Sequence, residues 1–161
     1  MKVIFLDIDG VLNSKKYITS MKDLWDDPKY QMDPLAVARL NRITDTTGAD
    51  IVVSSTWRLA FTHHLDKLQD CMASYGITGR VIGMTPDLVA MDYNLYMAKP
   101  TRGGEIDQWL FDNTNPMAKD YVIVLDDETV DGWRHVHVKT NFDDGLQDSH
   151  VDQAIALLGK I

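Results

Sequence analysis

The sequence has few of the features that stabilise a protein covalently or place it in a membrane. Its 161 residues include a single cysteine, Cys71, which excludes an internal disulfide and a cysteine-based metal cluster. No segment approaches the roughly 20 consecutive apolar residues that a membrane-spanning helix needs. The apolar run at the N-terminus is short and ends at two carboxylates, which is typical of a strand and not of a signal peptide. We therefore expect a cytoplasmic protein with no membrane partner.

Basic residues are also scarce. The chain has 24 acidic and 16 basic residues, which gives a net charge of −8 and a pI near 4.9. A broad surface for duplex nucleic acid is therefore not expected. A small anionic substrate is compatible with this charge, because a bound divalent cation can reverse the local potential.

Short apolar runs alternate with helical patterns along the chain. Runs typical of strands buried on both faces lie at residues 2–6, 51–53, 81–82 and 121–125, and a weaker run at 136–138 is typical of an edge strand. Helical stripes cover residues 34–47, 65–75, 104–112 and 151–158. This alternation predicts one α/β domain over residues 1–161, with a doubly wound, five-stranded parallel sheet. Such sheets bind ligands at the carboxyl ends of their strands.

Carboxylates follow the first and fourth predicted strands. Asp7 and Asp9 come directly after the first strand, where alternation puts both on one side of the extended chain and Gly10 permits a sharp turn. Asp126 and Asp127 follow the fourth strand. Carboxylates this close repel one another unless a cation or a shared proton intervenes. Because all the candidate ligands are oxygens, the cation that suits them is Mg²⁺.

Hydroxyl and basic side chains lie at other strand ends and at a helix entrance. Ser54, Ser55 and Thr56 follow the second strand, where they can hold phosphate oxygens or cap the next helix. Lys99 and Arg102 flank a glycine-rich helix entrance, where a cation can clamp a phosphoryl group. All these groups are predicted to meet at one edge of one sheet, which indicates a site for a phosphorylated ligand.

Together these residues resemble the four motifs of the haloacid dehalogenase (HAD) superfamily of phosphotransferases. The motifs match, in chain order, at Asp7 with Asp9, at Ser54, at Arg102, and at Asp126 with Asp127. More narrowly, the segments DIDGVLN, VVSSTWR, TRGGEIDQWL and VIVLDDE look like the minimal-cap HAD phosphatase domains of nucleic-acid repair proteins and polynucleotide kinase–phosphatases.

The resemblance implies a Mg²⁺-dependent phosphatase that works through an aspartyl-phosphate intermediate. Asp7 would attack phosphorus, and Asp9 would protonate the leaving oxygen and then deprotonate the hydrolytic water. The residues with catalytic roles would be Asp7, Asp9, Ser54 and Arg102. Further candidates for phosphate or substrate binding are Gly10, Ser55, Thr56, Arg58 and Lys99. The metal ligands would be Asp7, Asp126, Asp127 and the backbone carbonyl of Asp9.

The substrate depends on what covers the site. The spacing of the motifs leaves no room for a large cap domain, although residues 14–31 can form a small flap and residues 85–99 can overhang the site. An open site favours a nucleotide or a phosphorylated nucleic-acid end, on whose bases Trp57, Tyr93 and Tyr96 could stack. The alternatives are a phosphatase for small metabolites such as sugar phosphates, and a non-catalytic phosphate-binding module on the same scaffold. The sequence does not determine the oligomeric state.

Overall fold

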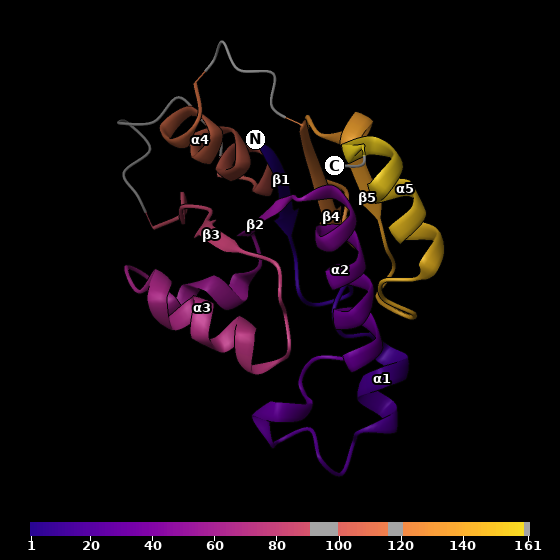
Figure 1. The fold of residues 1–161 in the computed structure, drawn as a ribbon. Coiled ribbons are helices and arrows are strands. Elements are labelled where there is room, and N and C mark those ends of the chain that lie inside the picture. The colour runs from indigo at the N-terminus through magenta and orange to yellow at the C-terminus, as the bar shows by residue number, and fades with distance from the viewer. Residues whose placement is uncertain (91–99, 116–120, 160–161) are drawn as a thin grey trace.

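The apolar runs of the sequence form a parallel sheet at the centre of the molecule (Figure 1). The computed structural model describes residues 1–90, 100–115 and 121–159. Within them, five strands pair in the order β3-β2-β1-β4-β5. Their bounds are β1 Lys2–Leu6, β2 Asp50–Val53, β3 Val81–Met84, β4 Tyr121–Asp126 and β5 His137–Lys139. All neighbouring strands pair in parallel, and β5 is an edge strand as predicted.

Helices cover both faces of the sheet, which confirms the doubly wound α/β fold. The α-helices are α1 Lys15–Ser20, α2 Pro34–Thr47, α3 Leu65–Ser74, α4 Arg102–Asn113 and α5 Asp148–Leu158. Three short 3₁₀ helices are also described, namely η1 Pro28–Tyr30, η2 Thr56–Phe61 and η4 Arg134–Val136. The caps of α2 follow the sequence signals, because the Asp33 side chain accepts from the Leu35 N–H and Gly48 ends the helix with φ 67°.

The alternation of side chains along β1 explains why its sequence is apolar throughout. Ile4 and Leu6 belong to one buried cluster, which also contains residues of α2, α3 and α5. Val3 and Phe5 point to the opposite face, where their cluster includes Ile106 of α4. Since β1 is covered on both faces, its residues from Val3 to Leu6 are fully buried.

The strand order places the switch point of the sheet at β1 and β4. From β1 the chain moves outward through β2 to β3, and it then returns to the other side of β1 for β4 and β5. Residues that follow β1 and β4 therefore lie at the crevice where open α/β sheets bind ligands.

The predicted flap, residues 14–31, contains α1 and η1 and lies beyond the carboxyl end of β1 (Figure 1). Several hydrogen bonds tie it to the rest of the described chain, and two of them are short. The Lys15 N–H donates to the Phe142 carbonyl at 2.7 Å, and the Tyr75 hydroxyl donates to the Pro28 carbonyl at 2.6 Å. Of the predicted overhanging loop, residues 91–99 lie outside the described part of the chain, including Tyr93, Tyr96 and Lys99. None of the helices in the described residues is both long and apolar enough to cross a membrane.

Candidate active site

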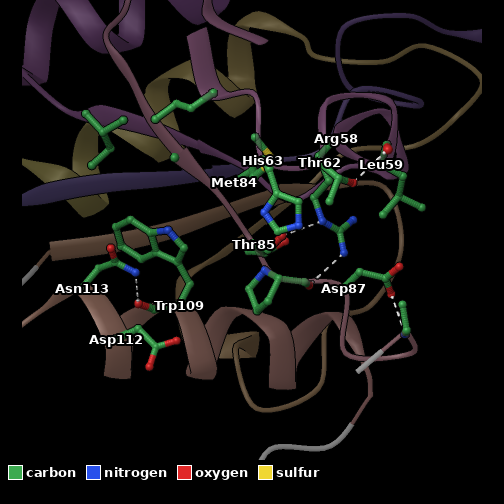
Figure 2. A pocket seen from close by; sticks show the side chains of 15 residues that line it. Arg58, Leu59, Thr62, His63, Met84, Thr85, Asp87, Trp109, Asp112 and Asn113 are labelled. Atoms are coloured by element: carbon green, nitrogen blue, oxygen red, sulfur yellow. Dashed lines mark hydrogen bonds between the residues drawn. The ribbon is translucent and has the colours of Figure 1, made fainter. Parts of the chain in front are cut away.

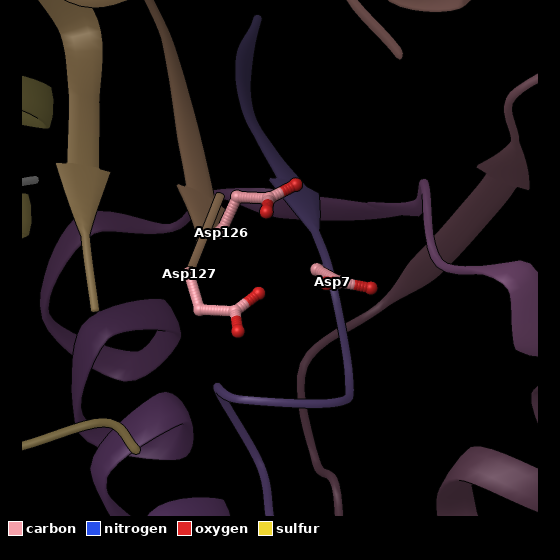
Figure 3. A group of neighbouring side chains, drawn as sticks. All are labelled: Asp7, Asp126 and Asp127. Carbon is pink, nitrogen blue, oxygen red and sulfur yellow. The ribbon is translucent and has the colours of Figure 1, made fainter. Parts of the chain in front are cut away.

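Three carboxylates meet where β1 and β4 end. The Asp7 N–H continues the pairing of the two strands by donating to the Leu125 carbonyl at 2.9 Å. Asp126 is the last residue of β4 and is fully buried, and Asp7 is 6% exposed. Oxygen atoms of Asp7, Asp126 and Asp127 lie within 4.8 Å of one another, and Figure 3 shows their side chains around one space. Parallel pairing thus brings together carboxylates that are more than a hundred positions apart in the sequence.

The tight turn after Asp9 brings Asp127 close to β1. Gly10 has φ 77°, a conformation that residues with a Cβ adopt only at a cost. A Cβ on Gly10 would also overlap the carboxyl group of Asp127. The turn is fixed by the residue that follows β5, because the Thr140 hydroxyl donates to the Gly10 carbonyl at 2.6 Å. Gly10 therefore leaves space for Asp127 in the carboxylate cluster.

Arg102 is the cation that faces this cluster. Its Nη1 lies 2.7 Å from Asp126 Oδ2 and 3.1 Å from Asp7 Oδ1. Arg102 begins α4, whose first turn is capped by the Thr101 hydroxyl accepting from the Gly104 N–H at 3.2 Å. Burial lowers the pKa of the Arg102 guanidinium, but the charges of Asp7 and Asp126 outweigh burial and raise the pKa overall. Arg102 is thus a permanent cation at the predicted nucleophile.

The cluster keeps excess negative charge in spite of Arg102. Burial, and then the charge of Asp7, raise the pKa of Asp126 to about 6 against the opposing effect of Arg102. The pKa of Asp127 is raised for the same two reasons, burial first. Among the described residues, three close carboxylates face one cation and form a donor set of hard oxygens in need of positive charge. Such a set fits Mg²⁺, which binds through carboxylates and keeps several waters.

Of the three hydroxyls after β2, only that of Ser54 is buried without a partner. Ser54 is fully buried, and its N–H donates to the Leu6 carbonyl at 2.9 Å, which places it beside the end of β1. Its Oγ has no hydrogen-bond partner within the described residues. Buried hydroxyls are usually bonded, so this group is available to a ligand oxygen. Ser55 instead caps η2 by accepting from the Trp57 N–H, and Thr56 is exposed.

Asp9 differs from Asp7 in its surroundings. Its side chain is exposed, and each of its two carboxylate oxygens accepts a hydrogen bond. Asn13 Nδ2 donates to Oδ1 at 2.7 Å, and the indole Nε1 of Trp57 donates to Oδ2 at 3.2 Å. Asp9 is not one of the three residues whose side chains form the carboxylate cluster. A solvent-facing carboxylate held in one orientation beside a buried one suits the exchange of protons with a substrate.

Arg58, which the sequence suggested as a phosphate-binding residue, is buried and bonded within the fold. It is 4% exposed, and its guanidinium donates to the backbone carbonyls of Ser54, Ser55, Thr85 and Pro86. It also forms a 2.8 Å ion pair with the buried carboxylate of Glu105 on α4. Because its donors are already used, Arg58 fastens the ends of β2 and β3 to α4. A basic residue near a site has the same signal in the sequence whether it binds a ligand or stabilises the fold, so the sequence could not distinguish the two roles.

Arg58 also lines a pocket of about 630 Å³ (Figure 2). His63, Met84, Thr85 and Trp109 are among the residues that line it. His63 is the one non-glycine residue with positive φ, 64°, among the described residues. The lining also includes Ala90, after which the described part of the chain is interrupted. Arg58 thus lines this pocket and also bonds the backbone of Ser54.

Comparison with known proteins identifies the family of this chain. The model of the HAD domain in Swiss Army Knife RNA repair proteins matches residues 3–151. The chain belongs to this family. No curated protein and no solved structure matches the chain significantly. The match confirms the resemblance to HAD phosphatases of nucleic-acid repair proteins, and it includes residues of every strand of the described sheet.

Seen as a HAD domain, the structure brings together Asp7, Ser54, Arg102, Asp126 and Asp127 at one sheet edge. Lys99, the alternative to Arg102, lies outside the described residues. The sequence by itself gave no reason to place Asn13 or Glu105 in the site, and it suggested Trp57 only as a stacking residue. Asn13 belongs to the quoted segment DIDGVLN, but an amide in a turn has too many uses for its bond to Asp9 to be predicted.

Proposed function

We propose that this HAD domain is a Mg²⁺-dependent phosphatase that hydrolyses a phosphomonoester through an aspartyl phosphate on Asp7. The observation that carries the proposal is the cluster of Asp7, Asp126 and Asp127 with Arg102 Nη1 3.1 Å from Asp7. The cluster combines a buried carboxylate nucleophile, a set of oxygen ligands and a fixed cation at one point of the sheet. Phosphoryl transfer depends mainly on positioning and charge stabilisation, which this combination supplies.

The proposed roles follow from the positions of the side chains. Asp7 attacks phosphorus in line with the leaving oxygen, and Arg102 offsets the charge of the approaching phosphate. The free Ser54 hydroxyl donates to a phosphoryl oxygen. Mg²⁺, held by Asp7, Asp126, Asp127 and the Asp9 carbonyl, supplies further charge neutralisation when bound. Asp9 protonates the leaving oxygen and afterwards takes a proton from the water that hydrolyses the aspartyl phosphate.

For the substrate, we propose a nucleotide or a phosphorylated nucleic-acid end. Two observations support this choice. The family is defined by domains of RNA repair proteins. The predicted flap offers only one six-residue α-helix and one 3₁₀ turn, which is too little to enclose a small substrate. Asp9 is exposed, so the alcohol side of a bound phosphomonoester would face solvent and could carry a polymer.

The test compares phosphate release from a 3′-phosphorylated oligonucleotide, a 5′-mononucleotide and a sugar phosphate. We expect release that requires Mg²⁺, favours the nucleic-acid substrates and falls to background in Asp7→Asn, a variant with the same side-chain shape. Full turnover in Asp7→Asn would refute the mechanism. Faster hydrolysis of the sugar phosphate would support the metabolite phosphatase instead.

A binding assay separates an enzyme from a phosphate-binding module. Beryllofluoride mimics the phosphoryl group on an aspartate, so together with Mg²⁺ it should stabilise the wild type. At about 100 times its Kd a ligand adds about 2.7 kcal/mol of stability, which raises the Tm of a domain of this size by roughly 5–11 °C. Asp7→Asn should show no such rise. A wild type that is also unresponsive would favour the non-catalytic module.

A further inference from the structure

The carboxylate of Asp9 is held by one hydrogen bond on each oxygen. Asn13 Nδ2 donates to Oδ1 at 2.7 Å, and Trp57 Nε1 donates to Oδ2 at 3.2 Å. The terminal torsion of an aspartate has a broad energy profile, so the side chain alone does not set the plane of its carboxylate. Two donors on opposite oxygens do set it. The orientation of Asp9 is therefore imposed by its neighbours and not by its own rotamer.

The two donors are themselves fixed by bonded neighbours. Asn13 is 1% exposed, its Oδ1 accepts from the Gly10 N–H at 3.1 Å, and its Nδ2 also faces the Gln31 carbonyl at 3.4 Å. The Trp57 ring meets the Tyr75 ring edge-on, with centroids 6.2 Å apart and planes at 67°. The Tyr75 hydroxyl in turn donates to the Pro28 carbonyl. Each side of Asp9 is thus linked to the segment 14–31 that was predicted as a flap.

From this geometry we infer that Trp57 is a positioning residue for proton transfer, acting through Asp9. Its indole N–H holds Oδ2, and Tyr75 keeps the indole in place. The inference deepens the proposed function and rests on it, because the task of Asp9 is to protonate the leaving oxygen. In that step the P–O bond to the leaving group breaks, and the leaving oxygen takes the proton from Asp9 while phosphorus bonds to Asp7. A misplacement of about 1 Å can cost such a step up to about 100-fold in rate.

The informative variant is Trp57→Phe, which removes the N–H and keeps an aromatic ring against Tyr75. Its matched control is Trp133→Phe, because Trp133 also interacts with a carboxylate, that of Asp107 on α4, and packs against Phe5 in the other core cluster. Asn13 is less suitable, since its bonds to Gly10 and Gln31 would be lost together with its bond to Asp9.

The first measurement tests the contact without using activity. The chain has four tryptophans, so a spectrum of ¹⁵N-labelled protein shows four indole N–H resonances, and the one missing in Trp57→Phe belongs to Trp57. In Asp9→Asn the charged acceptor becomes neutral and its hydrogen bond weakens. We expect the Trp57 resonance to move upfield while the other three stay in place. An unmoved Trp57 resonance would overturn the inference.

The second measurement tests the role of the contact. Alcohol release is followed in single turnovers with excess enzyme, so that only the first phosphoryl transfer is observed. An alkyl leaving group needs a proton and p-nitrophenolate does not. We expect Trp57→Phe to slow alcohol release from an alkyl phosphate by about tenfold or more. The same variant should release p-nitrophenolate from p-nitrophenyl phosphate within about twofold of the wild-type rate. Trp133→Phe should change neither rate.

The outcomes separate this inference from the proposed function. Equal losses on both substrates would mean that Trp57 only stabilises the fold, and no loss on either would mean that Asp9 is oriented without it. Both results overturn the inference and leave the phosphatase standing. A higher KM for an oligonucleotide with an unchanged single-turnover rate would assign Trp57 to base stacking instead. A wild type without turnover on any phosphomonoester would refute the proposed function, and with it the inference.

Discussion

Replacing Glu105 with Gln tests the assignment of Arg58 to the fold and not to the phosphate. The two side chains form a 2.8 Å ion pair in which Arg58 is 5% and Glu105 9% exposed. Burial lowers the pKa of Arg58 and raises that of Glu105. The free-energy cost of desolvating each group is therefore only partly offset by the charge of its partner. Glu105→Gln leaves the guanidinium buried without a counter-charge, but it cannot remove any contact with phosphate.

The expected magnitude follows from this burial. Removing one partner of a buried ion pair costs about 3–5 kcal/mol. We expect about 3 kcal/mol for Glu105→Gln, because the single glutamine oxygen can still accept from Arg58 in place of Glu105 Oε2, although the Leu88 N–H, 3.4 Å from Glu105 Oε1, then loses its acceptor. For a chain of this length the loss corresponds to a Tm lower by roughly 6–12 °C. Arg58→Met should lose more, since four backbone carbonyls then lack their donor.

The assay is thermal and urea unfolding of the metal-free protein, with Asp152→Asn as the control. Asp152 forms an ion pair with Arg42 in which the side chains are 79% and 48% exposed, so the control should lie within about 0.5 kcal/mol of the wild type. If Glu105→Gln unfolds within about 1 °C of the wild type while Arg58→Lys loses affinity for phosphate, the structural role given to Arg58 is wrong.

Two further predictions concern the carboxylate cluster. Gly10→Ala should weaken Mg²⁺ binding, measured by calorimetry, more than Gly76→Ala does. Both glycines have positive φ, but only a Cβ at Gly10 would overlap Asp127. Equal effects of the two variants on Mg²⁺ binding would contradict this prediction. The pKa of Asp126 is about 6 in the fold, above its ordinary value, so the metal-free protein should lose up to about 3 kcal/mol of stability from this group as pH rises from 4 to beyond 6. Asp126→Asn should remove that part of the pH dependence, as measured by urea unfolding across this range.

The sequence alone determined the α/β fold and most of the candidate site. Continuous apolar runs separated by amphipathic stripes allow few arrangements other than a parallel sheet with helices on both faces. In such a sheet the carboxyl ends of neighbouring strands lie together, so Asp7 and Asp126 were predictable as neighbours without any distance being known. The order of the motifs then matched one family.

Only the tertiary structure decided what each polar side chain near that edge contacts. Ser54, Ser55 and Thr56 are equivalent as hydroxyls in the sequence, but β2 buries Ser54 with a free Oγ, whereas Ser55 caps η2. Arg58 has the charge of a residue that binds phosphate, but its burial against Glu105 gives it a structural role. The bond from Trp57 to Asp9 joins residues 48 positions apart. Composition and spacing limit which groups can meet, but hydrogen bonds act over about 3 Å, and the partners at that range are chosen by packing.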